Sequence, residues 1–275
     1  MTSKQPRESR SSIPNLLHHI YDALRVMRAD RPGLFVDFDG TISHLAATPD
    51  EAIVSPRAAA SLRRLAVNLP LVCVISGRAA GDLRNKVGLD QVLYVGNHGA
   101  EQMEDGSLRV VPGLEEYSQK IGRVLDQLRE SVDIPGISWE NKRYSAAVLF
   151  RATTEPERAR SALQAALKDV ESAAGLHVFW GKMLLEIRPP TGIHKGYALR
   201  NLVRERSLNG AIFIGDDMTD LDALVALKEM REQGSIRGLG VAVVDEDTPE
   251  ELVRAADYAL QGVSEVEELL ERLKP

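Results

Sequence analysis

The chain has 275 residues, of which 44% are hydrophobic and 27% charged, and its formal net charge is −6. A negative molecule gives no reason to expect nucleic acid or an anionic membrane as a partner, and no apolar run is long enough to span a bilayer. The single cysteine, Cys73, excludes an intramolecular disulfide, and we expect a buried, inert thiol. The N-terminus carries no hydrophobic segment of a signal peptide, so we expect a cytoplasmic protein. Because no long apolar heptad pattern is present, we also expect a monomer.

The N-terminal region, residues 1–31, is predicted to be a tail followed by a helix. Residues 1–12 are rich in Ser, Arg and Lys, which predicts disorder. Apolar residues then recur at helical spacing, namely Leu16, Leu17, Ile20, Leu24 and Met27. The predicted helix ends near Pro32.

A set of short, near-continuous apolar runs predicts the main sheet. The runs are Leu34–Val36, Leu71–Ile75, Val92–Val95, Ala211–Ile214 and Val241–Val244. Runs of this kind suit parallel strands that are buried on both faces. Helix-start signals lie between several of them: Ser55 precedes a proline, and Thr248 precedes Pro249 with a capping-box glutamate. The alternation predicts an α/β fold, a doubly wound parallel sheet formed by residues 32–112 and 190–275.

Residues 113–189 interrupt this alternation and predict a smaller, inserted α+β domain. A helical stretch from Leu114 to about Val132 leads to a strand-like segment at Tyr144–Phe150. A second helix runs from Pro156 to about Ala174, and a hairpin follows at 177–187. We therefore expect a second domain between core strands three and four.

Polar residues follow the core strands, at the edge where ligands collect in open α/β sheets. They are Asp37 and Asp39, then Ser76 and Arg78, then Asn97 and His98, and finally Asp216, Asp217 and Asp220. Two carboxylates about 4 Å apart repel by roughly 4 kcal/mol at an effective dielectric of about 20. The converging aspartates therefore require a cation, and an all-oxygen ligand set favours Mg²⁺. Lys195, at a predicted helix start, adds a fixed positive charge beside the crevice.

The spacing of Asp37 and Asp39 suggests that the two carboxylates have different catalytic roles. Side chains at i and i+2 point the same way from an extended backbone, so one carboxylate can attack an electrophile while the other serves the leaving group. A carboxylate is a competent nucleophile toward phosphate when a metal shields its charge, and a second one can act as acid and base. Thr41 can bond a phosphoryl oxygen. Taken alone, a DxDG sequence is often only a turn, and GDDxTD can simply start a helix. The joint occurrence of these motifs in order after buried strands favours the catalytic interpretation.

These residues resemble the four motifs of the haloacid dehalogenase-like (HAD) superfamily. The matching segments are DFDGT at 37–41, the serine of ISGR (Ser76), Lys195, and GDDMTD at 215–220. The resemblance implies a phosphoaspartyl intermediate on Asp37, acid/base catalysis by Asp39, and phosphate contacts from Ser76 and Lys195. It also implies Mg²⁺ binding by Asp37, the main-chain carbonyl of Asp39, and Asp216, with support from Asp217 and Asp220.

Further motifs resemble the trehalose-6-phosphate phosphatases over roughly residues 33–262. They are VISGR, VGNHGAE, WENKRYSAAVLFR, GKMLLEIRPP and HKGYALRNL. The resemblance implies a sugar phosphate substrate whose hydroxyls contact Glu140, Lys142 and Glu186 of the inserted cap, with the basic Arg151 nearby. Asn97 and His98 are expected to face the sugar from the core, and Arg78 is expected to bind the substrate as well. Without the resemblance, a solvated surface pair is the favoured interpretation of Glu140 and Lys142, and a turn residue is the favoured interpretation of His98. One position departs from the family: Leu149 stands where a histidine is usual.

The predicted function is Mg²⁺-dependent hydrolysis of trehalose 6-phosphate to trehalose and phosphate. No synthase domain is recognisable in the chain, so we expect any contact with a trehalose-phosphate synthase to be transient and with a separate protein. Two alternatives stay open: a phosphatase for another glycosyl phosphate, such as a sucrose, mannosyl- or glucosylglycerol type, and a non-catalytic sugar-phosphate sensor. The complete set of Asp37, Asp39, Lys195 and Asp216 speaks against the sensor, since a mere binder needs no acid/base.

Overall fold

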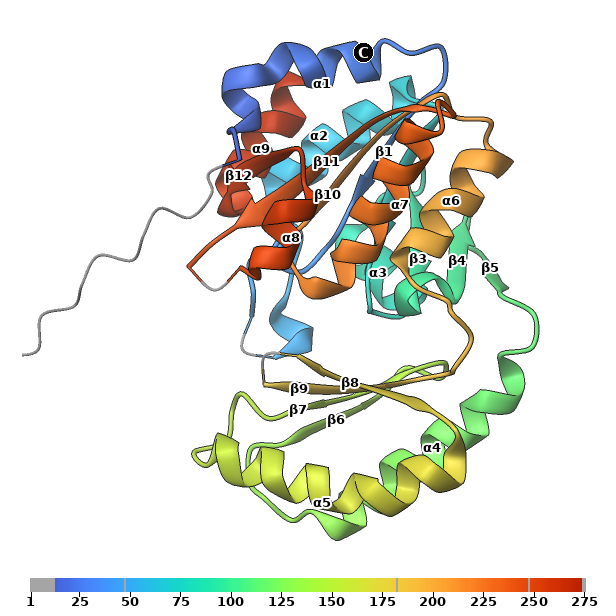
Figure 1. The fold of residues 1–275 in the computed structure, drawn as a ribbon, viewed down its shortest axis with the longest axis vertical. Coiled ribbons are helices and arrows are strands. Elements are labelled where there is room, and N and C mark those ends of the chain that lie inside the picture. The colour runs from blue at the N-terminus through green and yellow to red at the C-terminus, as the bar shows by residue number, and fades with distance from the viewer. Residues whose placement is uncertain (1–12, 47, 182, 247, 274–275) are drawn as a thin grey trace, which may run out of the picture.

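The computed structural model describes residues 13–46, 48–181, 183–246 and 248–273. In these ranges the chain forms two sheets with helices packed around them (Figure 1). The predicted disorder of residues 1–12 concerns a segment outside the described residues. No helix in the described part of the chain is long and apolar enough to cross a membrane.

The larger sheet confirms the predicted doubly wound α/β class. Within the described residues it has eight strands in the order β12-β11-β10-β1-β2-β3-β4-β5. Six of them run parallel, namely β1 (Pro32–Val36), β2 (Leu71–Ile75), β3 (Leu93–Gly96), β10 (Gly210–Gly215), β11 (Arg237–Val244) and β12 (Tyr258–Gln261). An antiparallel hairpin, β4 (Glu101–Glu104) and β5 (Ser107–Val110), forms one edge.

Helices cover both faces of this sheet, as the buried strands require. One face is covered by α1 (Ile20–Met27), α2 (Pro56–Asn68), α3 (Ala80–Val87) and α9 (Gly262–Arg272). The other face is covered by α6 (Lys195–Glu205), α7 (Leu221–Glu232) and α8 (Glu250–Ala255). Alternate residues of β1 enter the two cores: Leu34 and Val36 pack on the first side, and Phe35 on the second. Cys73 is buried on the second side as a free thiol, as expected.

Two local predictions differ from the structure. The N-terminal apolar stretch is a 3₁₀ helix, Leu16–His19, followed by α1 rather than one continuous helix, with Asn15 as the N-cap. Ser55 caps α2 as predicted, accepting from the main-chain nitrogen of Ala58. Thr248 does not cap α8, because its hydroxyl bonds Asp245 instead.

The second, smaller sheet has the order β6-β7-β9-β8 among the described residues and is antiparallel throughout. Its strands are β6 (Ser138–Asn141), β7 (Ala146–Leu149), β8 (His177–Gly181) and β9 (Leu184–Arg188). Two helices, α4 (Glu115–Ser131) and α5 (Pro156–Ala174), pack on the face turned away from the larger sheet (Figure 1). We call this unit, α4 through β9, the cap. The domain boundaries at 112/113 and 189/190 stay predictions.

The cap sheet has one apolar and one polar face because side chains alternate along its strands. Leu185 and Ile187 of β9 pack with α4 and α5 in the cap core. Glu186 and Arg188 therefore point to the opposite face, toward the larger sheet. The fold thus places a polar cap surface over the carboxyl ends of β1, β2, β3 and β10 (Figure 1).

Candidate active site

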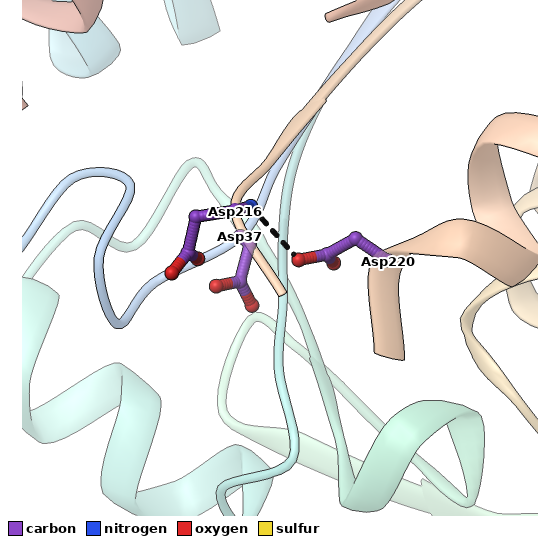
Figure 2. A group of neighbouring side chains, drawn as sticks. All are labelled: Asp37, Asp216 and Asp220. Atoms are coloured by element: carbon purple, nitrogen blue, oxygen red, sulfur yellow. Dashed lines mark hydrogen bonds between the residues drawn. The ribbon is translucent and has the colours of Figure 1, made fainter. Parts of the chain in front are cut away.

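A group of three carboxylates lies where β1 and β10 end. Val36 and Ile214 pair in parallel register, so Asp37 and Asp216 emerge side by side from neighbouring strands. Asp220, in a 3₁₀ turn before α7, completes the group, and the described residues offer no other such set (Figure 2). One oxygen of each carboxylate lies within 4.8 Å of those of the other two. We call Asp37, Asp216 and Asp220 the acidic trio.

Lys195 neutralises part of this charge. It is the first residue of α6, and its Nζ atom lies 2.6 Å from Oδ1 of Asp37 and 2.6 Å from Oδ1 of Asp220. Its side chain is 2% exposed. Burial on its own lowers the pKa of Lys195, but the charges of Asp220 and Asp37 outweigh it and raise that pKa above its ordinary value. Lys195 is therefore a permanent cation in the site.

One lysine does not balance three carboxylates, of which Asp37 and Asp220 are buried and Asp216 is half-buried. Burial, opposed by Lys195 and reinforced by Asp220, raises the pKa of Asp37 from 3.8 to about 7. Burial and the charge of Asp37 raise the pKa of Asp216 well above its ordinary value. Such repulsion among oxygen donors is relieved by a hard divalent cation, and Mg²⁺ prefers carboxylate and carbonyl oxygens. The donor set of the acidic trio fits this ion.

The other two predicted metal ligands lie outside the acidic trio. The side chain of Asp217 is exposed and caps the 3₁₀ turn, where it accepts a bond from the main chain of Asp220. The carboxylate of Asp39 pairs with Arg78, as described below. The ligand roles of Asp217 and of the Asp39 carbonyl stay predictions.

Thr41 and Gly40 lie against Asp216. Thr41 is fully buried and its hydroxyl donates to Oδ1 of Asp216 over 3.2 Å. Gly40 has φ +78°, and a Cβ there would lie 2.1 Å from Oδ2 of Asp216. A glycine is therefore required by both the backbone conformation and the close approach of the carboxylate. The predicted phosphate contact of Thr41 stays a prediction.

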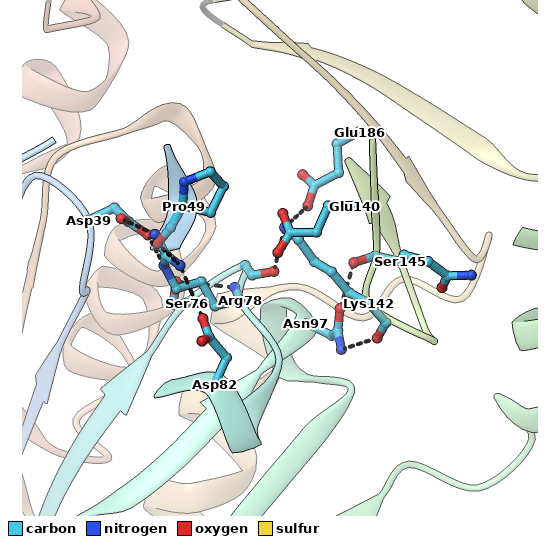
Figure 3. Close-up of polar contacts among 12 residues, drawn as sticks. Asp39, Pro49, Ser76, Arg78, Asp82, Asn97, Glu140, Lys142, Ser145 and Glu186 are labelled. Carbon is cyan, nitrogen blue, oxygen red and sulfur yellow. Dashed lines mark hydrogen bonds and ion pairs between the residues drawn. The ribbon is translucent and has the colours of Figure 1, made fainter. Parts of the chain in front are cut away.

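Ser76 and Arg78 follow β2, next to β1. Ser76 is buried, and its hydroxyl accepts from the main-chain nitrogen of Arg78 at 3.3 Å. Arg78 binds Asp39 in a bidentate ion pair, with Nε to Oδ2 at 2.7 Å and Nη2 to Oδ1 at 2.8 Å (Figure 3). The pair brings the predicted phosphate-binding loop and the predicted acid/base into direct contact.

The cap docks on two consecutive core residues, Asn97 and His98. Both are buried and adopt positive φ, 48° and 56°, a conformation that non-glycine residues rarely adopt without compensating contacts. Asn97 donates from Nδ2 to the carbonyl of Lys142 over 3.1 Å and accepts from the Ser145 hydroxyl at 2.5 Å (Figure 3). The main-chain nitrogen of Asn97 donates to the carbonyl of Arg78, and that of His98 donates to the carbonyl of Ser76. The docking residues are thus bonded directly to the loop after β2.

Glu186 is the centre of a buried polar group between cap and core. His98 Nε2 lies 2.6 Å from Oε1 of Glu186, Arg188 pairs with Oε2, and Lys142 Nζ is 4.0 Å from Oε1. Burial lowers the pKa of His98 to about 3, against the opposing charge of Glu186. Burial alone raises the pKa of Glu186, but its contacts with His98 and Arg188 lower it well below the ordinary value. The group therefore contains a carboxylate and a neutral imidazole at neutral pH.

The remaining predicted cap residues take two positions. Glu140 pairs with Lys142 at 3.7 Å, and Lys142 also donates to the carbonyl of Gly77 over 3.0 Å, so both belong to the Glu186 side (Figure 3). Arg151 is exposed and donates to the carbonyl of Ala46 in the loop after β1. It touches the core at a different place from the group around Glu186.

Sequence reasoning missed Arg188 and Ser145. Arg188 is two residues after Glu186 on β9, and this spacing was the available signal, because residues i and i+2 of a strand share a face. The Nε atom of Arg188 and the Nδ1 atom of His98 are buried without a hydrogen-bond partner among the described residues. The interface therefore retains capacity to bond further polar groups.

Comparison with solved structures shows that other proteins share this fold. The C-terminal domain of the Candida albicans trehalose-6-phosphate phosphatase superposes with a TM-score of 0.78 at 22% identity, covering 96% of this chain and 99% of that one. A trehalose-6-phosphate phosphatase related protein gives 0.72 at 22% identity, covering 87% and 95%. At these identities the likeness concerns the fold.

The sequence profile of the trehalose-phosphatase family matches residues 35–263, and the chain belongs to this family. A trehalose-phosphate phosphatase of Mycobacterium avium is 31% identical over 276 residues, covering 96% of this chain and 67% of that protein. An uncharacterized glycosyl hydrolase of Mycobacterium tuberculosis is 35% identical over 246 residues, covering 85% of this chain. The chain spans only 18% of the length of that relative.

Proposed function

We propose that the protein is a phosphomonoesterase that hydrolyses trehalose 6-phosphate to trehalose and phosphate, with Mg²⁺ as cofactor. The observation that carries this proposal is the position of Asp37, buried at the end of β1 between Lys195 and the other two acids of the trio. Membership of the trehalose-phosphatase family supports the substrate. Phosphate monoesters hydrolyse extremely slowly without catalysis, so a charged, preorganised site of this kind is needed.

The acidic trio would hold the Mg²⁺ ion, with the main-chain carbonyl of Asp39 and the side chain of Asp217 as the further ligands predicted from the sequence. When bound, the ion supplies charge neutralisation for the nucleophile and the phosphoryl oxygens. Lys195 contributes a second, permanent positive charge toward the phosphate, and Ser76 and Thr41 contribute hydroxyl contacts.

The chemistry divides into two half-reactions. In the first, an oxygen of Asp37 bonds to phosphorus, the bond from phosphorus to the sugar oxygen breaks, and that oxygen takes a proton from the carboxyl group of Asp39. In the second, water attacks the phosphorus, Asp39 accepts a proton from this water, and the bond to Asp37 breaks. The products are trehalose, inorganic phosphate and the original carboxylate.

The cap supplies sugar recognition in this proposal. Residues 113–189 move as a unit against the core, and closure excludes water during attack by Asp37. Glu140, Lys142 and Glu186 accept from and donate to glucose hydroxyls, with Asn97 and His98 facing them from the core side. Arg151 contributes at the loop after β1.

One observation favours a second candidate, a phosphatase for another glycosyl phosphate. Leu149 of β7 is only 8% exposed, is absent from the apolar core of the cap and stands opposite Leu184. It makes part of the core-facing cap surface apolar where the family usually has histidine. A substrate with fewer hydroxyls at that end would suit such a surface.

The experiment is a phosphate-release assay with Mg²⁺ on trehalose 6-phosphate, sucrose 6-phosphate, mannosyl- and glucosylglycerol phosphates and p-nitrophenyl phosphate. Among these compounds, we expect trehalose 6-phosphate to have the highest kcat/KM, and we expect EDTA to abolish activity. A higher value for another sugar phosphate would establish the second candidate. Tight binding of a sugar phosphate with no release from any compound would identify a sensor.

A further inference from the structure

Arg78 has little hydrogen-bonding capacity left for a substrate. Besides the two bonds to Asp39, its Nη1 atom donates to the carbonyl of Pro49 and to Oδ2 of Asp82, each over 3.0 Å (Figure 3). Four of its five N–H donors are therefore used by described residues. Its side chain is 9% exposed, and the guanidinium lies 5.3 Å from the ring centroid of Phe38. A bidentate clamp on a phosphate needs two free donors, and Arg78 has one.

These contacts instead fix the position of Asp39. The Asp39 carboxylate is one-third exposed and follows Asp37 by two residues, so without a partner it would sample several rotamers. The bidentate pair holds both of its oxygens in one plane, while Asp82 on α3 and the carbonyl of Pro49 hold the guanidinium from the other side. Arg78 is thus anchored to three separate segments of the core and presents Asp39 in one orientation.

The hydrogen-bond geometry of Asp39 fits one of the two half-reactions directly. Both oxygens of Asp39 accept from the guanidinium of Arg78. A carboxylate held as an acceptor in a fixed orientation matches the second half-reaction, in which Asp39 accepts a proton from water. In the first half-reaction Asp39 acts as a donor, a role that this bidentate acceptor geometry does not serve.

We propose that Arg78 is a positioning residue for the second half-reaction: it holds Asp39 as the proton acceptor while water hydrolyses the phosphoryl group on Asp37. The inference rests on the proposed function, because it needs the phosphoaspartyl intermediate. In this step the water oxygen bonds to phosphorus, one water proton passes to Asp39, and the bond between phosphorus and Asp37 breaks. Arg78 itself exchanges no proton, since guanidinium stays charged in proteins.

The test uses Arg78→Met and p-nitrophenyl phosphate with Mg²⁺, because p-nitrophenolate leaves without a proton and the first half-reaction then needs no acid. We expect kcat to fall by about 10²-fold, a typical contribution of general base catalysis, and KM to fall with it. The value of kcat/KM stays within about twofold of wild type, since it reports only the steps up to nitrophenolate release. Stopped-flow mixing shows a burst of one nitrophenolate per enzyme molecule, and mass spectrometry shows one added phosphoryl group.

The controls separate this inference from its basis. Arg84→Met removes another arginine that pairs with an aspartate close by, Asp90, but not with Asp39. It should leave kcat, KM and the burst amplitude at their wild-type values. Asp39→Asn should give the same burst as Arg78→Met, and the double variant should add little to either single change. Arg78→Lys, which offers Asp39 only a single contact, should give an intermediate kcat.

Two results would overturn the inference. If Arg78→Met and Arg78→Lys both lower kcat/KM as much as kcat and show no burst, Arg78 has a structural or substrate-binding role. Thermal unfolding of each variant shows whether folded protein has been lost. Such a loss reduces the number of active sites, so it lowers kcat and kcat/KM by the same factor and also lowers the burst amplitude. If Asp39→Asn also lacks a burst, the two-step mechanism of the proposed function fails as well.

Discussion

The Nζ atom of Lys195 lies 2.6 Å from Oδ1 of Asp37, although the two residues are 158 positions apart in the chain. The contact joins the start of α6 to the end of β1, and both side chains are buried. It is the only fixed positive charge that the described residues bring to hydrogen-bond distance of Asp37. Lys195 also pairs with Asp220, so removing Lys195 leaves two buried carboxylates without their partner, which is strongly destabilising.

Replacing Lys195 by methionine should therefore lower the free energy of unfolding by about 3–5 kcal/mol, measured by urea unfolding in EDTA at pH 7. The matched control is Arg254→Met, which breaks an exposed pair with Glu250 on α8 and should cost less than about 1 kcal/mol. Equal losses in the two variants would show that Lys195 does not compensate the acidic trio.

Replacing Glu186 by alanine should reduce kcat/KM for trehalose 6-phosphate by about 10²-fold or more, because a buried, hydrogen-bonded carboxylate is lost from the cap surface that we propose to bind the sugar. Hydrolysis of p-nitrophenyl phosphate, which has no sugar, should change by less than about threefold on the same reasoning. Glu130→Ala, an exposed change on α4, serves as the control. Equal loss on both substrates would exclude a role in sugar recognition.

Replacing Ser145 by alanine should weaken docking of the cap. The change removes the donor to Oδ1 of buried Asn97 and should cost the closed state about 1.4 kcal/mol, or tenfold in KM for trehalose 6-phosphate. Ser131→Ala, whose exposed hydroxyl bonds only within α4, should leave KM unchanged. An unchanged KM in both variants would mean that the Asn97–Ser145 contact does not stabilise the substrate-bound cap.

Acid should destabilise the group around His98. The pKa of His98 is lowered to about 3 by burial, from 6.5 in the unfolded chain, so the folded state binds fewer protons between these values. Stability is then fully present above pH 6.5 and falls as the pH is lowered toward 3, by about 2 kcal/mol at pH 5. The lowered pKa of Glu186 adds a loss of the same sign below pH 4.5.

The measurement is urea unfolding at pH 7 and pH 5 for wild type, His98→Asn and His177→Asn. His98→Asn should lose about 2 kcal/mol less than wild type between these pH values. His177→Asn, an exposed change on β8, should keep the wild-type difference. The same pH difference in all three proteins would mean that His98 is protonated in the folded state at pH 5.

Much of the core and cap follows from the sequence because buried parallel strands are continuous apolar runs. The strands near residues 34, 71, 93, 211 and 241 and the helices α4 and α5 lie where the pattern places them. The hairpin of β4 and β5 was not predicted, because its strands are four residues long and largely lack buried side chains, so they show no continuous apolar run like those of the parallel strands. Its pairing with β3 is a tertiary effect that local pattern does not encode.

The candidate site was predictable to the extent that it follows strand ends. The neighbouring positions of β1 and β10 bring Asp37 and Asp216 together as expected. The pairing of Asp39 with Arg78 was not foreseen, because it depends on side-chain orientation across two loops. The exposed position of Asp217 was not predictable either, because it follows from the local 3₁₀ turn that this residue caps. The sequence alone does not distinguish a capping aspartate from a metal ligand in such a motif.

The proposed function requires Asp37 to accept the phosphoryl group of trehalose 6-phosphate. Wild-type protein turning over this substrate with Mg²⁺ can be quenched in acid, digested and analysed by peptide mass spectrometry. We expect one phosphoryl group on the peptide that contains Asp37. In Asp37→Asn, both this phosphoryl group and the release of phosphate should be absent. A phosphoryl group on another residue, such as Ser76, or phosphate release by Asp37→Asn at the wild-type rate, would contradict it.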